Sequence, residues 1–233
     1  MIIKYFLSFT FLFNLVEAGS LKGHVKYDGK APKPKRLRMG ADPVCGSSHS
    51  GPVYSENFKM AKDGSMEDAL VWLKNVDYSG GVPSSPAVLD QKGCVYAPHV
   101  FGMMAGQELL IKNSDATLHN IHSMPKVNKE FNFAMPKVVK KKKSTFAKSE
   151  PNPFYIKCDV HPWMKTWVLV SDHPYYAVTD ESGNFTIENI PAGTYEVVCW
   201  QEKFGSKRAL QSKVTIGDGS TTKDFVFSRP KKK

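Results

Sequence analysis

Three side chains that bind soft metals stand close together in residues 154–164, Phe-Tyr-Ile-Lys-Cys-Asp-Val-His-Pro-Trp-Met. Cys158 offers a thiolate, His161 an imidazole and Met164 a weak thioether, each three residues after the one before. The residues on both sides are rich in β-branched and aromatic side chains, which predicts a loop that closes two neighbouring strands. Such a loop can direct all three side chains at one point.

A second histidine is needed to complete a metal site. The polar turn at residues 113–118 follows a strand-like pattern at residues 108–112 and delivers His119. One thiolate, two imidazoles and a distant thioether suit a copper ion used for electron transfer. The alternatives are that Met164 is a core residue, that His119 is an ordinary turn residue, or that the site is structural or inactive. Zinc is disfavoured because it prefers four good ligands and gains little from a thioether.

This pattern resembles the cupredoxins, the small blue copper proteins. The pair His119-Asn120 and the spacing Cys-x-x-His-x-x-Met are most similar to the amicyanin and plastocyanin group, and the short loop matches amicyanin. The resemblance covers roughly residues 88–172 and implies a Greek-key β-sandwich. It also implies one type 1 copper site, with the ligands His119, Cys158, His161 and Met164.

The resemblance also assigns roles to residues near the ligands. Asn120 is expected to tie the two ligand loops together, and Asn113 to support the ligands from nearby. Backbone N–H groups near the thiolate, including one after Asn113 or Asn120, are expected to tune the reduction potential. His122 follows His119 by three residues, but strand alternation directs it away from the metal. His122, His99 and His49 could form a second metal site, which the sequence does not decide.

An electron carrier needs a contact surface. The resemblance implies that His161, Pro162 and Trp163 lie at the protein edge, in an apolar patch where electrons leave. Small apolar patches suit brief encounters between proteins. A further apolar group either joins this patch or packs within an ordinary loop: Phe101, Met103 and Met104.

A second motif lies downstream. Residues 176–197 contain Thr-Asp-x-x-Gly-x-Phe and then Pro-Ala-Gly-x-Tyr, which resembles the carboxypeptidase regulatory-like (transthyretin-like) β-sandwich. Gly183 and Gly193 are expected to adopt positive φ in tight turns. The Gly-x-Val and Ala-x-Val strands that normally begin this family lie far upstream, at residues 23–25 and 69–71.

These two resemblances predict an all-β chain with two sandwiches. The simplest interpretation is a split domain, in which residues 19–80 and 174–230 form the carboxypeptidase regulatory-like sandwich and residues 88–172 form an inserted cupredoxin-like unit. The alternative is two sequential domains, in which the N-terminal strands complete the cupredoxin sandwich. Short alternating strands separated by Gly, Pro, Asn and Asp fit either arrangement.

The N-terminus indicates where the protein works. Residues 1–18 resemble a signal peptide, with Lys4 before a short apolar run and a small-residue cleavage site at the end. This predicts a periplasmic or secreted protein, with a short N-terminal anchor as the alternative. Cysteines in the loops of exported proteins form disulfides, so Cys45 and Cys94 are predicted to pair. Cys199 is predicted to be a buried thiol that packs as a small apolar residue.

The chain is basic, with 32 Lys and Arg against 22 Asp and Glu and a formal net charge of +10. Lysines are concentrated at residues 137–143 and at residues 231–233. They form a solvated face or steer acidic redox partners, such as cytochromes or a dehydrogenase, or an anionic membrane surface. Nucleic acid is not expected, because no aromatic-basic recognition motif is present.

No enzyme is expected either. The sequence contains no Gly-x-Ser-x-Gly, no His-Glu-x-x-His and no phosphate loop. The sequence therefore predicts an exported blue copper protein that carries single electrons between redox partners. The alternative is a non-catalytic module that binds carbohydrate or protein and has a structural or vestigial metal site. A row of exposed aromatic residues would favour that alternative: Trp72, Tyr78 and Trp200.

Overall fold

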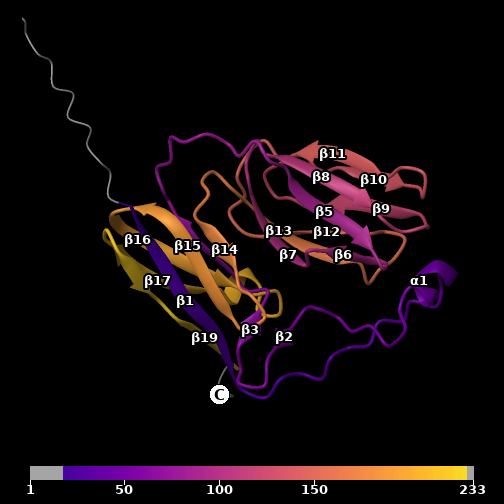
Figure 1. The fold of residues 1–233 in the computed structure, drawn as a ribbon, viewed down its shortest axis with the longest axis horizontal. Coiled ribbons are helices and arrows are strands. Elements are labelled where there is room, and N and C mark those ends of the chain that lie inside the picture. The colour runs from indigo at the N-terminus through magenta and orange to yellow at the C-terminus, as the bar shows by residue number, and fades with distance from the viewer. Residues whose placement is uncertain (1–17, 230–233) are drawn as a thin grey trace, which may run out of the picture.

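The computed structural model describes residues 18–229, and in them the chain is all-β, as predicted. The strands form two adjacent lobes (Figure 1). The predicted signal peptide, apart from its last residue, and the C-terminal lysines lie outside the described residues. Among residues 18–229, no helix has the length and apolar character needed to cross a bilayer.

One lobe, the flanking sandwich, joins the two ends of the described chain. Strand β1 (Ala18–Asp28) pairs antiparallel with β15 (Asn184–Pro191) and parallel with β18 (Ser220–Thr222) and β19 (Phe225–Ser228). An apolar core separates this sheet from a second one. The strands of the second sheet are, in order, β14 (Tyr176–Val178), β4 (Leu70–Lys74), β16 (Gly193–Trp200) and β17 (Leu210–Ile216).

The other lobe, the inserted unit, contains the strands between β4 and β14. One sheet has the order β10 (Asn132–Met135), β9 (His119–Ser123), β12 (Phe154–Lys157), β13 (Lys165–Ser171) and β7 (Val100–Met104). The facing sheet has the order β11 (Lys141–Thr145), β8 (Glu108–Asn113), β5 (Ala87–Lys92) and β6 (Val95–Ala97). Both sheets contribute to one apolar core, and neither borrows a strand from the flanking sandwich.

The two lobes share a third apolar cluster. Along β4, Val71 and Leu73 point into the flanking sandwich, while Leu70 and Trp72 point toward the inserted unit. This alternation follows from the two-residue period of a strand, and burial on both faces explains why residues 70–73 are all apolar. The cluster also contains Val100 and Leu169 of the inserted unit, together with Val198 and Trp200.

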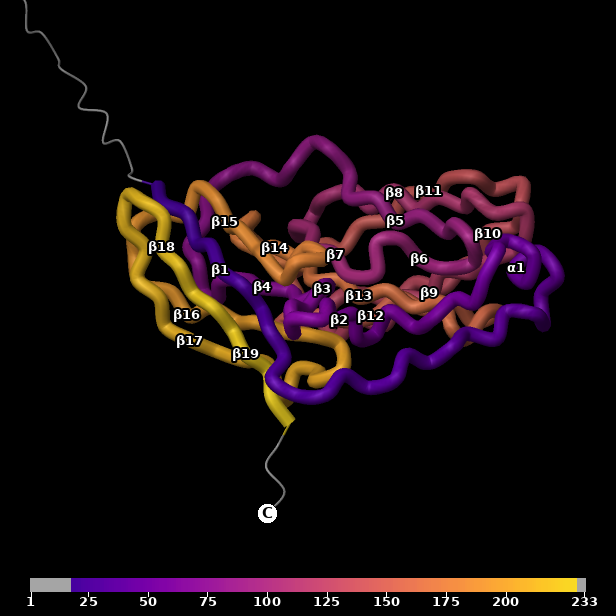
Figure 2. Tube along the Cα trace, turned by 60° about the horizontal axis from the view of Figure 1, so that its bottom comes forward, coloured from indigo at the N-terminus to yellow at the C-terminus, as the bar shows by residue number. Residues whose placement is uncertain are grey.

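Residues 29–58 leave the flanking sandwich and extend along the inserted unit. Figure 2 shows this segment, called the strap here, running out to the far end of the inserted unit and back. Its two passes pair with each other, because Leu37 N donates to Val53 O at 2.8 Å and Ser55 N donates to Lys35 O at 2.8 Å. At the tip is the short helix α1 (Pro43–Ser47), and a small hairpin, β2 (Lys59–Met60) and β3 (Met66–Glu67), follows the strap.

The tip of the strap is fastened to the inserted unit. Cys45 of α1 forms a disulfide with Cys94 in the β5–β6 turn, which confirms the predicted pairing. His49 Nε2 lies 2.6 Å from the carbonyl oxygen of Gly93 in the same turn. Met39 is buried in the core of the inserted unit. The strap runs along the outside of the inserted unit but contributes Met39 and Cys45 to its core.

The two glycines of the downstream motif behave differently. Gly183 has φ 77°, as predicted, in the turn before β15, and a Cβ there would lie 2.8 Å from the carbonyl oxygen of Val25. The prediction for Gly193 is wrong: it begins β16 without a positive φ. The left-handed residue near that turn is Asn189, with φ 56°. Asn tolerates this conformation better than most residues, so the glycine is not required for it.

We expect the disulfide to hold the strap in place. In the double variant Cys45→Ser and Cys94→Ser, a closed loop with a sequence separation of 49 residues is released. The chain-entropy model gives a loss of about 4 kcal/mol in the free energy of unfolding for a loop of this length. Urea unfolding checks the value. A reductant should destabilise the wild type and leave the double variant unchanged, and equal sensitivity of both proteins would contradict the prediction.

Candidate metal centre

His119 is the first residue of β9, and a hydrogen-bonded turn sets its position. The Asn113 side chain donates to Thr117 O at 3.1 Å and to Met135 O at 2.8 Å, and it accepts from Asp115 N at 3.1 Å. Asn113 is buried, so these bonds replace water and fix the turn. The predicted polar turn is therefore a rigid support for His119.

The other ligand candidates lie on the loop between β12 and β13. Cys158 N donates to Met164 O at 3.1 Å, and Met164 N donates to His161 O at 2.9 Å. These bonds close the loop at the ends of two paired strands. Cys158 and Met164 are both buried in the core of the inserted unit, and His161 is 2% exposed. The short spacing therefore produces a compact loop in which Cys158, His161 and Met164 are buried.

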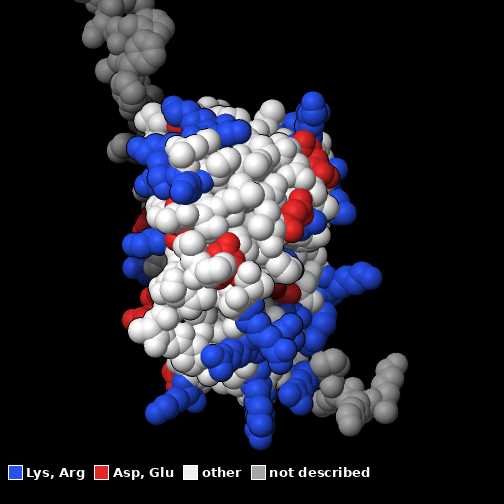
Figure 3. Space-filling model, turned by 90° about the vertical axis from the view of Figure 1, so that its right-hand side faces the viewer, with Lys and Arg blue, Asp and Glu red and all other residues white. Residues whose placement is uncertain are grey.

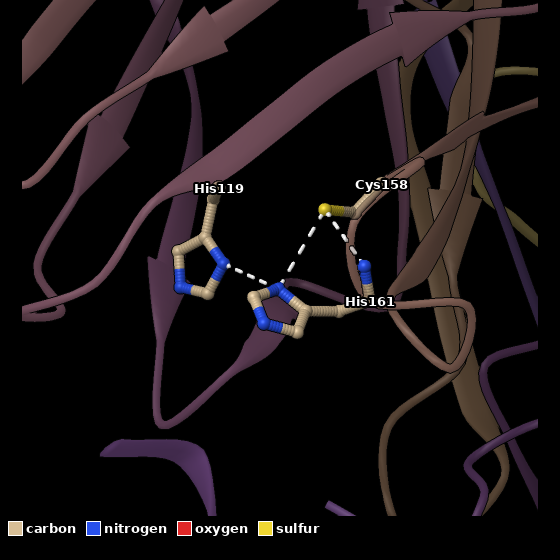
Figure 4. Close-up of side chains that lie close together, drawn as sticks. All are labelled: His119, Cys158 and His161. Carbon is tan, nitrogen blue, oxygen red and sulfur yellow. Dashed lines mark hydrogen bonds between the residues drawn. The ribbon is translucent and has the colours of Figure 1, made fainter. Parts of the chain in front are cut away.

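Three donor atoms converge at the end of the inserted unit (Figure 4). The Nδ1 atoms of His119 and His161 are 3.0 Å apart, and Cys158 Sγ is 3.8 Å from His161 Nδ1. The three residues can each offer one ligand atom within 4.8 Å of the others. A thiolate and two imidazole nitrogens at this separation can share one metal ion, and this set of donors is typical of copper.

The electrostatics favour a deprotonated sulfur. Burial alone raises the pKa of Cys158, but hydrogen bonds from His119 and from the N–H groups of His161, Asn120 and Val160 lower it below its usual value. Burial likewise opposes protonation of His119, but hydrogen bonds with Asp115 and Cys158 raise its pKa to about 9. The thiolate is the form of cysteine that binds metal, so its stabilisation favours metal binding, whereas His119 must release a proton before its Nδ1 can bind a metal.

Two carboxylates that the sequence did not reveal lie at the outer edges of the imidazoles. Asp115 Oδ2 is 2.8 Å from His119 Nε2, and Asp42 Oδ2 is 3.1 Å from His161 Nε2. A carboxylate at Nε2 accepts the proton that this nitrogen carries, so a metal would bind at Nδ1 once the Nδ1 proton of His119 is released. The orientation of both rings thus fits a metal bound through the two Nδ1 atoms.

Asp42 and Asp115 are themselves held in place. Asp42 caps α1 by accepting from Val44 N at 2.8 Å, and its other oxygen accepts from Thr117 Oγ1 at 2.9 Å. Asp115 accepts from Gly93 N and Cys94 N at 2.7 and 2.8 Å. Both carboxylates therefore connect a histidine with the segments joined by the disulfide.

Asn120 links the two ligand segments. Its side-chain oxygen accepts from Asp159 N at 2.9 Å, so β9 is bonded to the loop that starts at Cys158. Its amide nitrogen donates to Asn132 Oδ1 at 2.5 Å. The backbone N–H of Asn120 is also one of the groups that lower the pKa of Cys158. Asn120 therefore bonds the strand that begins with His119 to the loop that begins with Cys158.

The other histidines lie apart from the three donors. His122 points to the opposite face of β9, between Asp159 at 2.8 Å and Glu130 at 2.6 Å. His99 Nε2 is 2.7 Å from a carboxylate oxygen of Glu202 in the flanking sandwich. Burial lowers the pKa of His99, but Glu202 and the neighbouring acids raise it by more, so the pKa of His99 lies above its usual value. Within residues 18–229, none of the groups of three possible metal ligands includes His49, His99 or His122.

The expected electron-exit edge is covered. Cys45 Sγ lies 3.7 Å and Asp42 Oδ2 3.1 Å from His161 Nε2, and His161 is buried. The expectation of an exposed His161 is therefore wrong, because the strap lies over it. Pro162 is exposed and Trp163 is half-buried. The further apolar group packs inside the protein: Phe101, Met103 and Met104.

Figure 3 views the end of the molecule that carries α1. Its middle is mostly uncharged and holds a few Asp and Glu groups, and Lys and Arg side chains gather along the upper and lower edges. The resemblance implied an apolar patch centred on His161. The structure instead has a weakly charged surface with a basic rim at this end.

Comparisons with known proteins return two kinds of match. Residues 147–224 match the family described as polysaccharide lyase family 4, domain II. This match begins before β12, so it includes part of the inserted unit as well as strands β14 to β18. No curated protein matches the chain. The resemblance of the flanking sandwich to carboxypeptidase regulatory-like domains stays a prediction.

Solved copper proteins are structurally similar to part of the chain. A Cu-containing nitrite reductase from Thermus scotoductus is 20% identical over 42% of this chain, with a TM-score of 0.32, and the match spans only 25% of that enzyme. A Cu(I) amicyanin variant is 20% identical over 43% of this chain and 98% of its own, with a TM-score of 0.33. A purple cupredoxin from Nitrosopumilus maritimus is 22% identical over 36% of this chain and 99% of its own, at 0.31.

Similarity at this level carries no argument about function. The assignment of the metal therefore rests on the donor atoms of this chain and their surroundings.

We expect both carboxylates to strengthen metal binding. Asp115→Asn and Asp42→Asn keep the volume of the side chain, and Asn remains a good cap for α1. Each should weaken Cu(II) binding about 10- to 100-fold, because the negative charge behind a ligand imidazole is lost. Competition with a chelator of known affinity measures this effect.

Asp90→Asn is the matched control, since it removes the same charge from a surface carboxylate that accepts from Ser114 at 2.8 Å. Affinities that fall equally in all three variants would show that overall charge, and not the contact with the imidazoles, is responsible.

Proposed function

We propose that the protein is an exported type 1 copper protein that carries single electrons. The observation that carries this proposal is the convergence of two imidazole nitrogens and one thiolate sulfur in a buried position, all within 4.8 Å. His119, His161 and Cys158 would hold the metal, with Met164 as the weak fourth ligand. Copper bound by such a set supplies one-electron chemistry between its two common oxidation states.

The chain contributes rigidity to this chemistry. Asp115 and Asp42 fix the two rings, Asn120 fixes the loop, and the Cys45–Cys94 disulfide fixes the strap above them. A site that is held in one arrangement changes little between oxidation states, which is what rapid electron transfer needs. The backbone N–H groups around Cys158 also stabilise negative charge on its sulfur and so influence the reduction potential.

A carrier accounts for the site better than an enzyme does. Catalytic metal centres keep one position open for water or substrate. Here the strap covers His161, carboxylates occupy the outer nitrogens of both rings, and the three donor residues are buried. A closed site of this kind favours a function in which electrons, and not substrate atoms, reach the metal.

The remaining parts of the proposal follow from the sequence. We place the protein in the periplasm or outside the cell on the basis of residues 1–18, and its net charge of +10 favours acidic redox partners, such as a cytochrome or a dehydrogenase. The same charge is compatible with loose attachment to an anionic membrane surface.

A binding module is the second candidate. The match to a polysaccharide lyase domain over residues 147–224 favours it, because that domain belongs to a family of carbohydrate-active proteins. The aromatic row that would serve such a function does not form, however. Trp72 and Trp200 are buried in the contact between the lobes, and Tyr78 packs against Tyr175 with the ring centroids 5.9 Å apart. We therefore rank this candidate second.

The decisive variant is Cys158→Ser. Replacing the thiolate by a hydroxyl should abolish the intense visible band of the Cu(II) protein, because that band requires a sulfur bonded to copper. Visible absorption after addition of one equivalent of Cu(II) measures it. Cys199→Ala is the control, since Cys199 is buried in the flanking sandwich. A band that persists in Cys158→Ser would show that the ligands are assigned wrongly.

A further inference from the structure

A groove opens beside the candidate metal centre. It has a volume of about 440 Å³, within the usual range of ligand pockets, and it lies between the strap and the inserted unit. Trp163 and Met164 contribute to its wall from the loop that carries Cys158. His99, Lys165 and Glu202 contribute from the region where the lobes meet, so all three parts of the molecule form the groove.

This groove adjoins the buried donors through Trp163 and Met164. The Trp163 ring lies 5.1 Å from the ring of His161. Its indole N–H donates to Cys94 O at 2.9 Å, so the ring is fixed. Met164, also in the groove wall, accepts a backbone hydrogen bond from Cys158 N at 3.1 Å. Since the strap closes the outer edge of His161, Trp163 is the accessible neighbour of that ring.

The groove is positively charged on the strap side. Lys35, Arg36 and Arg38 are exposed, and within residues 18–229 none of them forms an ion pair. The two acids of the groove are already engaged: Glu202 with His99 at 2.7 Å, and Glu56 with Lys59 at 3.5 Å. The unpaired charge is therefore cationic, and it lies next to an aromatic and a thioether side chain.

We propose that this groove is the docking site for an acidic segment of a partner protein. Carboxylates of the partner pair with Lys35, Arg36 and Arg38, and the segment rests against Trp163. That the partner is a redox protein rests on the function proposed above, whereas the docking itself does not. A concave site bounded on two sides by protein fits a peptide segment better than it fits a membrane surface.

The test uses the mature chain in its metal-free and copper-loaded forms, with a synthetic hexaglutamate peptide as the probe. Binding is measured by titration calorimetry and by the shift of the Trp163 indole N–H signal in NMR spectra. The triple variant Lys35→Glu, Arg36→Glu and Arg38→Glu should bind the peptide at least about tenfold more weakly. The control Lys141→Glu, Lys142→Glu and Lys143→Glu makes the same change of charge on β11 and should stay within about twofold.

Three results would overturn the docking proposal: the wild type does not bind the peptide, both triple variants lose the same amount of affinity, or the Trp163 signal does not move. Phosphatidylserine vesicles that displace the peptide and lose affinity in the same variant would assign the groove to a lipid surface instead. An unchanged melting temperature shows that the variant folds. A blue band that is present without peptide binding refutes only the docking, and peptide binding without a blue band refutes only the copper function.

Discussion

The hydrogen bonds between two carboxylates and two histidines determine the arrangement of the whole site. Asp115 and Asp42 hold the outer nitrogens of His119 and His161, and this turns the inner nitrogens toward Cys158. Neither acid acts alone. Asp115 accepts hydrogen bonds from N–H groups of the turn that contains Cys94, and Asp42 caps the helix that contains Cys45. The disulfide, the strap and the ligand rings therefore form one connected structure.

The strap also changes how the site meets its surroundings. It crosses from one lobe to the other, covers His161 and leaves a groove that Trp163 helps to line. The flanking sandwich supports this arrangement through the apolar contact at Trp72 and Trp200, and through Glu202 at the groove. The flanking sandwich thus helps to shape access to the candidate metal centre, although its own sequence motif indicates no chemistry.

The ligand loop, the turn before His119 and the disulfide could all be predicted from local sequence. The spacing Cys-x-x-His-x-x-Met predicts the ligand loop because backbone bonds within a few residues close it, and the turn before His119 is just as local. The expectation of export and the loop positions of the cysteines were enough to predict the pairing of Cys45 with Cys94. The covering of His161 could not be predicted. Helix α1 has only five residues and no periodic pattern, and its position depends on contacts 75 to 119 residues away along the chain. Likewise, the pattern of β4 predicts a strand but not which of its faces a second lobe will bury.

X-ray absorption at the copper edge of the Cu(II)-loaded protein reports directly which atoms surround the metal. We expect one short bond to sulfur and two bonds to imidazole nitrogen, with no bound water, since the three donor residues are buried beneath the strap. A spectrum that contains only nitrogen and oxygen neighbours would rule out this site, because copper would then be bound somewhere other than between His119, Cys158 and His161.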